Sequence, residues 1–402
     1  MKKFDIFLIQ CNPILLLVGY VLMHSVLSLM GQNTRVASVI FDGVLLFMSI
    51  YIIAVCSKDF IIEKGKSLLT VLSVLLILYA LRMVFDVYAG PFSMEIPHSS
   101  MWNDILLTVG GSFFPTWAMI SSRKYIKLDA VVKGVFIAGL IACVFAFLNI
   151  RINGFSYEEG RLTLGGGLHT LALARLGAIE VIAALHMFLN GGKKRICYVA
   201  GILIGGFIAL ASGSRGGVAG VVVAIGIYMV VGARKRPLLM ALGAILVFLF
   251  MLDVVQILEW VGNYFPVFSD RMLDSIVESD QGGRELLRQK AVNLIYENPI
   301  IGYGYRLSSD STGYGPHHGI LEVLLCLGIP VGALFCYFVY LKGAIYSVAM
   351  MSDKRYVFPC LMAVFSFVTS MSSSSLSTNS FDFSMALLGV AYYYNYKMIK
   401  RT

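Results

Sequence analysis

Long uncharged runs of apolar residues recur from one end of the chain to the other. A helix needs about 20 mostly apolar residues to cross roughly 30 Å of hydrocarbon, and only helices and closed barrels satisfy every backbone polar group in lipid. Charged residues make up 14% of the chain, whereas about a quarter is usual in soluble domains. The pattern excludes a soluble globular protein. It predicts an all-α polytopic membrane protein that forms a single integral membrane domain over residues 1–402.

Hydropathy and the positions of the charges divide the chain into membrane spans and connecting loops. We predict about twelve spans, at 12–30, 36–56, 68–89, 105–122, 134–150, 168–190, 196–213, 217–233, 237–255, 319–341, 356–376 and 381–396. Most loops between them are short. The exception is the segment 256–318, between the ninth and tenth spans, and loops of this length are usually functional.

Lysine and arginine gather in every other connecting segment. If the N-terminus lies inside, the inner segments hold 21 of the 32 Lys and Arg residues and only five Asp and Glu residues. Such an excess of basic residues marks cytoplasmic loops. We therefore expect both termini in the cytoplasm and the loop 256–318 on the outer face. The net charge of +9 then reports orientation and does not indicate a nucleic-acid partner.

The long outer loop contains a segment with helical periodicity, about 282–297. Its apolar residues recur at spacings of three and four and form one stripe: Leu286, Leu287, Ala291, Leu294 and Ile295. Arg284 and Arg288 are one turn apart, and a guanidinium matches the oxygens of a phosphate. The pair suits a diphosphate. A solvated helix face, with Glu285 pairing with Arg288, explains the same residues.

Ionisable residues also fall inside the predicted spans or at their ends, where they are costly and mark function by default. They are Arg82 and Asp86 in the third span, Arg175 and Glu180 in the sixth, and Arg215 at the outer end of the seventh. Arg82 and Asp86 lie one turn apart, so a purely structural ion pair explains them equally well. No acidic residue lies close to Arg215 in the sequence, which favours an external anion.

Two adjacent histidines precede the tenth span. His317 and His318 follow a glycine-rich turn, and Glu322 comes one turn after them. Histidine titrates near neutral pH and is the usual general base. A histidine at a helix start also serves as a cap or a surface residue, and this alternative stays open.

Three segments together resemble the bacterial O-antigen polymerase and O-antigen ligase family. Residues 210–217 (LASGSRGG) resemble its Ser-Arg-Gly signature at an outer span end. Arg284, followed by residues 297–304 (ENPIIGYG), resembles its Arg…Pro-x-x-Gly-x-Gly element. Residues 317–332 resemble its His-Asn-x-x-Leu…Gly-x-x-Gly element. The chain departs from the family at His318, where Asn is usual, and it lacks the tryptophan common after the loop arginine.

The resemblance implies transfer of a glycan from undecaprenyl diphosphate at the periplasmic face of the inner membrane, with inversion at the anomeric carbon. It implies no cofactor, no metal and no nucleotide sugar. His317 would be the catalytic base, and Arg215, Arg284 and Arg288 would bind the diphosphate. The residues in supporting roles would be His318, Glu322, Arg82, Asp86, Arg175 and Glu180. The implied partners are a lipid-linked oligosaccharide donor and acceptor, the bilayer, and a protein that regulates chain length.

Three functions remain as alternatives. A polymerase would move the growing chain onto the next lipid-linked repeat unit, and we favour it because polymerases are numerous and diverse. An O-antigen ligase would use the same chemistry with lipid A–core as acceptor. A flippase or transporter for lipid-linked sugars would place the charged span residues along a path, but the inverted repeats and broken half-helices typical of transporters are not evident. Such a protein would also leave the long outer loop unexplained.

Overall fold

The computed structural model describes residues 2–32, 34–62, 67–89, 101–102, 105–153, 156–158, 161–163, 170–190, 194–233, 254–277, 284–304 and 318–373. Within them the chain is helical, as predicted, apart from one short antiparallel hairpin. The hairpin joins β1 (Ser156–Glu158) to β2 (Arg161–Thr163) with Tyr157 opposite Leu162. The predicted span 381–396 and most of the span 237–255 lie outside the described residues.

Helices are found in the described parts of the predicted spans, and several extend beyond the predicted bounds. In order they are α1 (Lys3–Ile14), η1 (Leu15–Gly19), α2 (Tyr20–Leu29), α3 (Thr34–Ile62), α4 (Ser67–Ala89), η2 (Leu106–Phe113), α6 (Phe114–Ser122), α7 (Leu128–Asn153), α8 (Thr170–Leu189), α9 (Arg195–Ala211), α10 (Arg215–Ala233), α12 (Val254–Gly262), α13 (Pro266–Val277), α14 (Arg284–Glu297), α15 (Gly319–Phe335), η5 (Cys336–Leu341), α16 (Lys342–Met350), η6 (Lys354–Tyr356) and α17 (Val357–Ser373). In this part of the chain, five helices are long and apolar enough to cross a membrane: Lys3–Leu29, Val36–Cys56, Leu128–Ile152, Thr170–Leu189 and Gly319–Met350. Two shorter apolar helices are Arg195–Ala211 and Arg215–Val231. The protein is a multi-pass membrane protein.

Small residues bring neighbouring helices into backbone contact. α8 packs on α9 at Gly177, where an added Cβ would lie 2.6 Å from the backbone nitrogen of Ala209 and would also meet the carbonyl oxygen of Gly205. Close approach of this kind is how helices associate in lipid, since burial of apolar side chains gives little driving force there.

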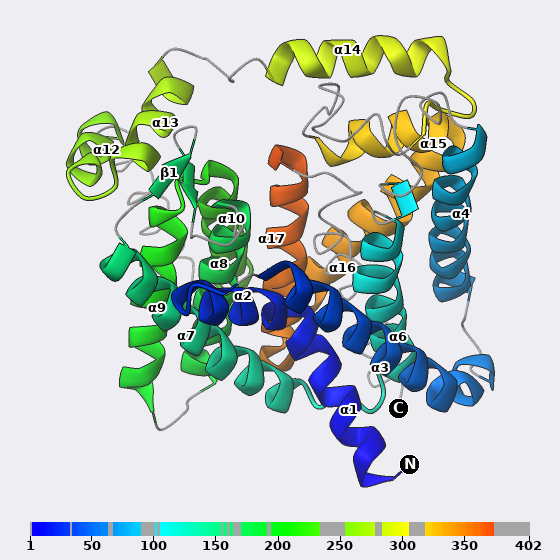
Figure 1. Cartoon of the computed structure of the whole chain (residues 1–402), viewed down its shortest axis with the longest axis horizontal. Coiled ribbons are helices and arrows are strands. Elements are labelled where there is room, and N and C mark those ends of the chain that lie inside the picture. Colours follow the sequence, from blue (N-terminus) through cyan, green and yellow to red (C-terminus); the bar gives the residue numbers. More distant parts are fainter. Residues whose placement is uncertain are drawn as a thin grey trace.

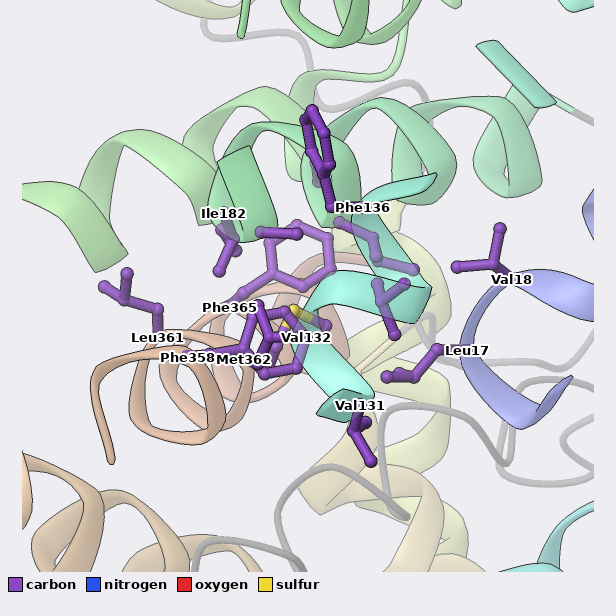
Figure 2. Packing of buried hydrophobic residues seen from close by; sticks show 14 of the residues in the cluster. Leu17, Val18, Val131, Val132, Phe136, Ile182, Phe358, Leu361, Met362 and Phe365 are labelled. Carbon is purple, nitrogen blue, oxygen red and sulfur yellow. The ribbon is translucent and has the colours of Figure 1, made fainter. Parts of the chain in front are cut away.

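Buried side chains form two large apolar clusters. The larger one joins η1, α7, α8 and α17, and Figure 2 shows Leu17, Val132, Ile182 and Phe358 within it. The second joins α4, η2, α15 and η5 around Tyr79 and Phe335. Because α15 belongs to the second cluster and contacts α17 of the first, the tenth predicted span connects the two halves of the molecule.

The helices of the predicted long loop lie along one edge of the molecule. In Figure 1, α13 and α14 run along the upper edge, with the β1–β2 hairpin beside α13, while the N-terminus lies at the opposite edge. α14 is the amphipathic helix predicted over 282–297, and it is observed at Arg284–Glu297. α12 and α13 were not predicted. They show that this part of the loop is folded as well.

Candidate active site

Four helices meet one another near the ends that carry the predicted site residues. An added Cβ at Gly217 of α10 would lie 2.6 Å from the Cβ of Ala174 in α8. One at Gly220 would lie 2.8 Å from the ring of Phe365 in α17. Gly319 of α15 packs against Ser370 of α17, where an added Cβ would lie 3.1 Å from the carbonyl oxygen of Ser370. The contacts link α8, α10, α17 and α15 into one connected group.

Three predicted residues lie beside these contacts. Arg175 follows Ala174 in α8, Arg215 begins α10 two residues before Gly217, and His318 directly precedes Gly319. Arg175 is 9% exposed, and Arg215 and His318 are half-buried. The predicted residues of α8, α10 and α15 thus lie at helix ends that belong to one packed group.

The Arg215 turn is fixed by a pair of arginines. Gly213 has a φ of +69°, which only glycine adopts without strain, and it turns the chain between α9 and α10. Nη1 of Arg215 donates to the carbonyl oxygen of Arg271 in α13 at 2.7 Å. Nη1 of Arg271 donates in return to the carbonyl oxygen of Gly213 at 3.2 Å. Arg271 was not predicted as a site residue, although it is a basic residue in the predicted outer loop.

α14 packs against the first half of α15. Ala291 and Ile295 of α14 are buried against Leu325 of α15, so most of the predicted apolar stripe is confirmed. Leu286 is the exception, because its side chain is 58% exposed. α15 covers only the face of α14 that carries Ala291 and Ile295. Leu287, one turn before Ala291, lies on that face, whereas Leu286 lies beside it and is exposed.

The two arginines of α14 are placed differently. Nη1 of Arg288 lies 4.0 Å from Oε2 of Glu285, the intrahelical pair that the alternative interpretation predicted. The Arg288 side chain is 26% exposed, and its Nε is buried. The backbone of Arg284 begins α14, but its side chain lies outside the described residues.

His318 caps the N-terminus of α15. It is extended, with φ −146° and ψ 112°, and its Nδ1 accepts from the backbone N–H of Leu321 at 3.5 Å. Burial lowers the pKa of His318 below its ordinary value of 6.5, and the positive charge of Arg288 lowers it further. The lowered pKa favours the neutral form, in which Nδ1 can accept the capping hydrogen bond. A cap is one of the structural alternatives for a histidine at a helix start. His317 lies outside the described residues.

Residues 298–304 form a turn that locks α14 onto α15. Gly302 and Gly328 both have positive φ, of +72° and +73°, and an added Cβ at Gly302 would lie 2.5 Å from the nitrogen of Gly328. The backbone N–H of Tyr303 donates to Leu325, and that of Ile329 donates to Pro299, each at 2.7 Å. Glycines of two separate family motifs are thus required at one backbone crossing.

Arg82 and Asp86 of α4 hold this turn. Nε of Arg82 donates to Oδ1 of Asp86 at 2.8 Å, and its Nη atoms donate to the carbonyl oxygens of Ile301 and Gly302 at 2.7 and 3.3 Å. Gly304 packs directly on Asp86, because an added Cβ would lie 2.5 Å from Oδ2. The pair therefore serves the structural role that the sequence left open.

The remaining acidic residues lie deeper in the molecule. Glu322 is 1% exposed, and its backbone N–H donates to the carbonyl oxygen of His318 at 3.0 Å. Glu180 is fully buried between α7 and α9, where added Cβ atoms would contact it at Gly139 and, at 2.7 Å from Oε1, at Gly201. Glu180 comes five residues after Arg175 along α8, roughly 7.5 Å further into the bundle. The structure places it away from the helix ends.

These features define a polytopic membrane protein in which an amphipathic helix packs over the ends of a helix bundle. Residues 200–336 match the family described as O-antigen ligase. The matched segment contains the Arg215 turn, the locked turn at 298–304 and α15. The match supports the resemblance to the O-antigen polymerase and ligase family that the motifs predicted. Among curated proteins, nothing matches the chain.

Proposed function

We propose that the protein transfers a glycan from undecaprenyl diphosphate to a sugar hydroxyl at the periplasmic face of the inner membrane. The family that residues 200–336 match implies a glycosyltransferase-type enzyme in general. The observation that carries the proposal is the packing of α14 on α15, which brings the charge of Arg288 to the histidine end of α15. That arrangement suits a cationic diphosphate site beside a base.

The chemistry assigns a role to each group. His317 takes the proton from the acceptor hydroxyl as its oxygen attacks the anomeric carbon and the bond to the diphosphate breaks, with inversion. Arg215, Arg284 and Arg288 stabilise the negative charge that develops on the leaving diphosphate. Fixed cations of this kind supply several kcal/mol, roughly 3 or 4 for a single donor. A guanidinium has five N–H groups, and Arg215 donates one of them to the carbonyl oxygen of Arg271. That hydrogen bond therefore leaves N–H groups for the diphosphate.

The test of this mechanism is His317→Ala, with His318→Asn as the matched control. We expect His317→Ala to abolish transfer while the protein still inserts and purifies normally. His318→Asn should keep most of the activity, because asparagine caps a helix well and is usual at this position in the family. Wild-type polysaccharide length in cells that carry His317→Ala would refute the role of His317.

The acceptor decides between polymerase and ligase. We favour the polymerase, which would extend capsular, exopolysaccharide or O-antigen repeat units, and the residues on α14 and α15 serve both reactions. Reconstitution with lipid-linked repeat units alone separates the two. Long chains formed without lipid A–core indicate the polymerase, whereas product that appears only when lipid A–core is added indicates the ligase. Movement of intact lipid-linked units without new glycosidic bonds would indicate a flippase.

A further inference from the structure

α12 and α13 form a compact helical hairpin on the outer loop. Oγ of Ser269 in α13 donates to the carbonyl oxygen of Leu258 in α12 at 2.5 Å. Gly262 lets the helices meet, because an added Cβ would lie 3.0 Å from that same Oγ. Leu258 and Phe268 are buried. The two helices therefore pack together as one unit.

One side of the hairpin is docked on the bundle. The ring of Phe265 lies edge-on against Phe207 of α9, with centroids 5.4 Å apart, and Phe207 meets Phe147 of α7 in the same way. Val267 packs on Gly213 at 3.0 Å from an added Cβ. With the Arg215–Arg271 pair, these contacts fix the hairpin to the turn that begins α10.

The other side of the hairpin carries two exposed aromatic rings. Trp260 is 63% exposed and Tyr264 is 64% exposed, and their centroids are 5.5 Å apart in an edge-to-face arrangement. Trp and Tyr have an apolar body and a polar handle, and they collect where a membrane meets water. Trp260 comes five residues after the predicted span 237–255, so the chain delivers both rings close to the membrane surface.

We propose that the α12–α13 hairpin is an interfacial anchor whose Trp260 and Tyr264 rings lie among the lipid headgroups of the outer leaflet. Through the docked side, the anchor holds the Arg215 turn at the depth of the headgroup phosphates. This role for the Arg215 turn rests on the proposed function, since the diphosphate of a lipid-linked donor lies at that same depth. The hairpin would thus set the level at which Arg215 meets its substrate.

The position of Trp260 can be measured directly. Trp102→Phe and Trp117→Phe leave it as the single tryptophan of the protein, which is then reconstituted in phosphatidylcholine vesicles with brominated acyl chains. We expect stronger quenching by bromines near the headgroup than by bromines near the chain end, and weak quenching by aqueous iodide. In the same background, a second protein with Trp260→Phe and Tyr264→Trp should show the same quenching pattern. It repeats the measurement at the neighbouring ring in case the first protein misfolds.

Two results would overturn the anchor. Strong iodide quenching without bromolipid quenching would place the rings in water. Protection from iodide by soluble oligosaccharides alone would show that the rings bind sugar and not lipid. The link to Arg215 is tested in the transfer assay with Trp260→Ser and Tyr264→Ser together. We expect a KM for the lipid-linked donor that is severalfold higher, with kcat little changed. An unchanged KM with the rings in lipid would refute the link and leave the proposed function intact.

Discussion

His318 shows how one substitution within a motif changes the physics of a helix end. Its Nδ1 accepts from Leu321, and a protonated imidazole has no acceptor left. The pKa of His318 is lowered in the folded protein, first by burial and then by Arg288, so the unfolded chain binds more protons near pH 6. Stability from this group is therefore complete above its ordinary pKa and is lost as the pH falls below about 6.5.

We accordingly predict that His318→Asn reduces the acid sensitivity of the protein. Asparagine caps α15 at any pH and does not titrate. The thermal midpoint in detergent, measured at about pH 8 and about pH 5.5, should fall less in the variant than in the wild type. An equal fall in both proteins would show that His318 protonates as easily when folded as when unfolded.

Gly328 is the residue at which α15 bends. Its φ is +73°, and an added Cβ would strike the carbonyl of Ile300. We predict that Gly328→Ala costs several kcal/mol of stability, because a positive φ alone costs about 1–2 kcal/mol for other residues and the collision adds to it. The loss of the thermal midpoint measures the effect.

Two other glycines separate the causes. Gly31 has a φ of +66° but open space around its added Cβ, and Gly206 has open space and ordinary helical backbone. Gly31→Ala should show the conformational cost alone, and Gly206→Ala should be neutral or stabilise by about 0.5–1 kcal/mol. Equal losses of stability at Gly328 and Gly31 would mean that the backbone at the Gly302–Gly328 crossing shifts to relieve the collision at little cost.

At the scale of the element, α4 and the turn 298–304 act together. Arg82 is 13% exposed and Asp86 is 4% exposed, and removal of one partner of such a buried pair costs about 3–5 kcal/mol. We predict that Arg82→Gln lowers both the thermal midpoint and glycan transfer. Arg82→Lys should recover only part of either, because lysine lacks the planar fork that reaches Asp86 and two carbonyl oxygens.

The exposed pair Arg355–Asp353 provides the control for that prediction. Its side chains are 62% and 23% exposed, and surface pairs are worth about 0–1 kcal/mol. Asp353→Asn should therefore leave both measurements nearly unchanged. Equally small effects of the substitutions at Arg82 and Asp353 would show that Arg82 does not hold the 298–304 turn in place.

Helices were predictable because their signal is local. α14 was predicted to within two residues, since apolar runs and periodicity are properties of consecutive residues. The described helices overlap the predicted spans, but some, such as α1 and α7, begin six to nine residues earlier. The contacts of the site are not local. Arg82 binds the carbonyl of Ile301, 219 residues away, and neither sequence segment indicates the other. The β1–β2 hairpin was missed because three-residue strands carry too little alternation to recognise.

At the scale of the whole molecule, the two faces predicted from the charge pattern can be compared with the positions of the elements in the structure. α13, α14 and the β1–β2 hairpin lie along one edge in Figure 1, with the N-terminus at the opposite edge. The predicted outer segments include all three elements, and the predicted inner segments include the N-terminus. A diphosphate site at the outer edge would meet arginines on the face that is otherwise acidic, so that few other cations compete for the anion.

This sidedness gives a prediction for the intact membrane. In a cysteine-free background, Gln289→Cys on α14 should react with a membrane-impermeant maleimide in cells whose outer membrane has been permeabilised. Ser352→Cys and Lys194→Cys, which lie in predicted inner segments, should react only after lysis. All three positions are exposed, so a difference in labelling reports the side of the membrane and not burial. Labelling of Ser352→Cys before lysis would contradict the orientation. Labelling of all three would show that basic residues do not mark the inner face of this protein, contrary to the general rule.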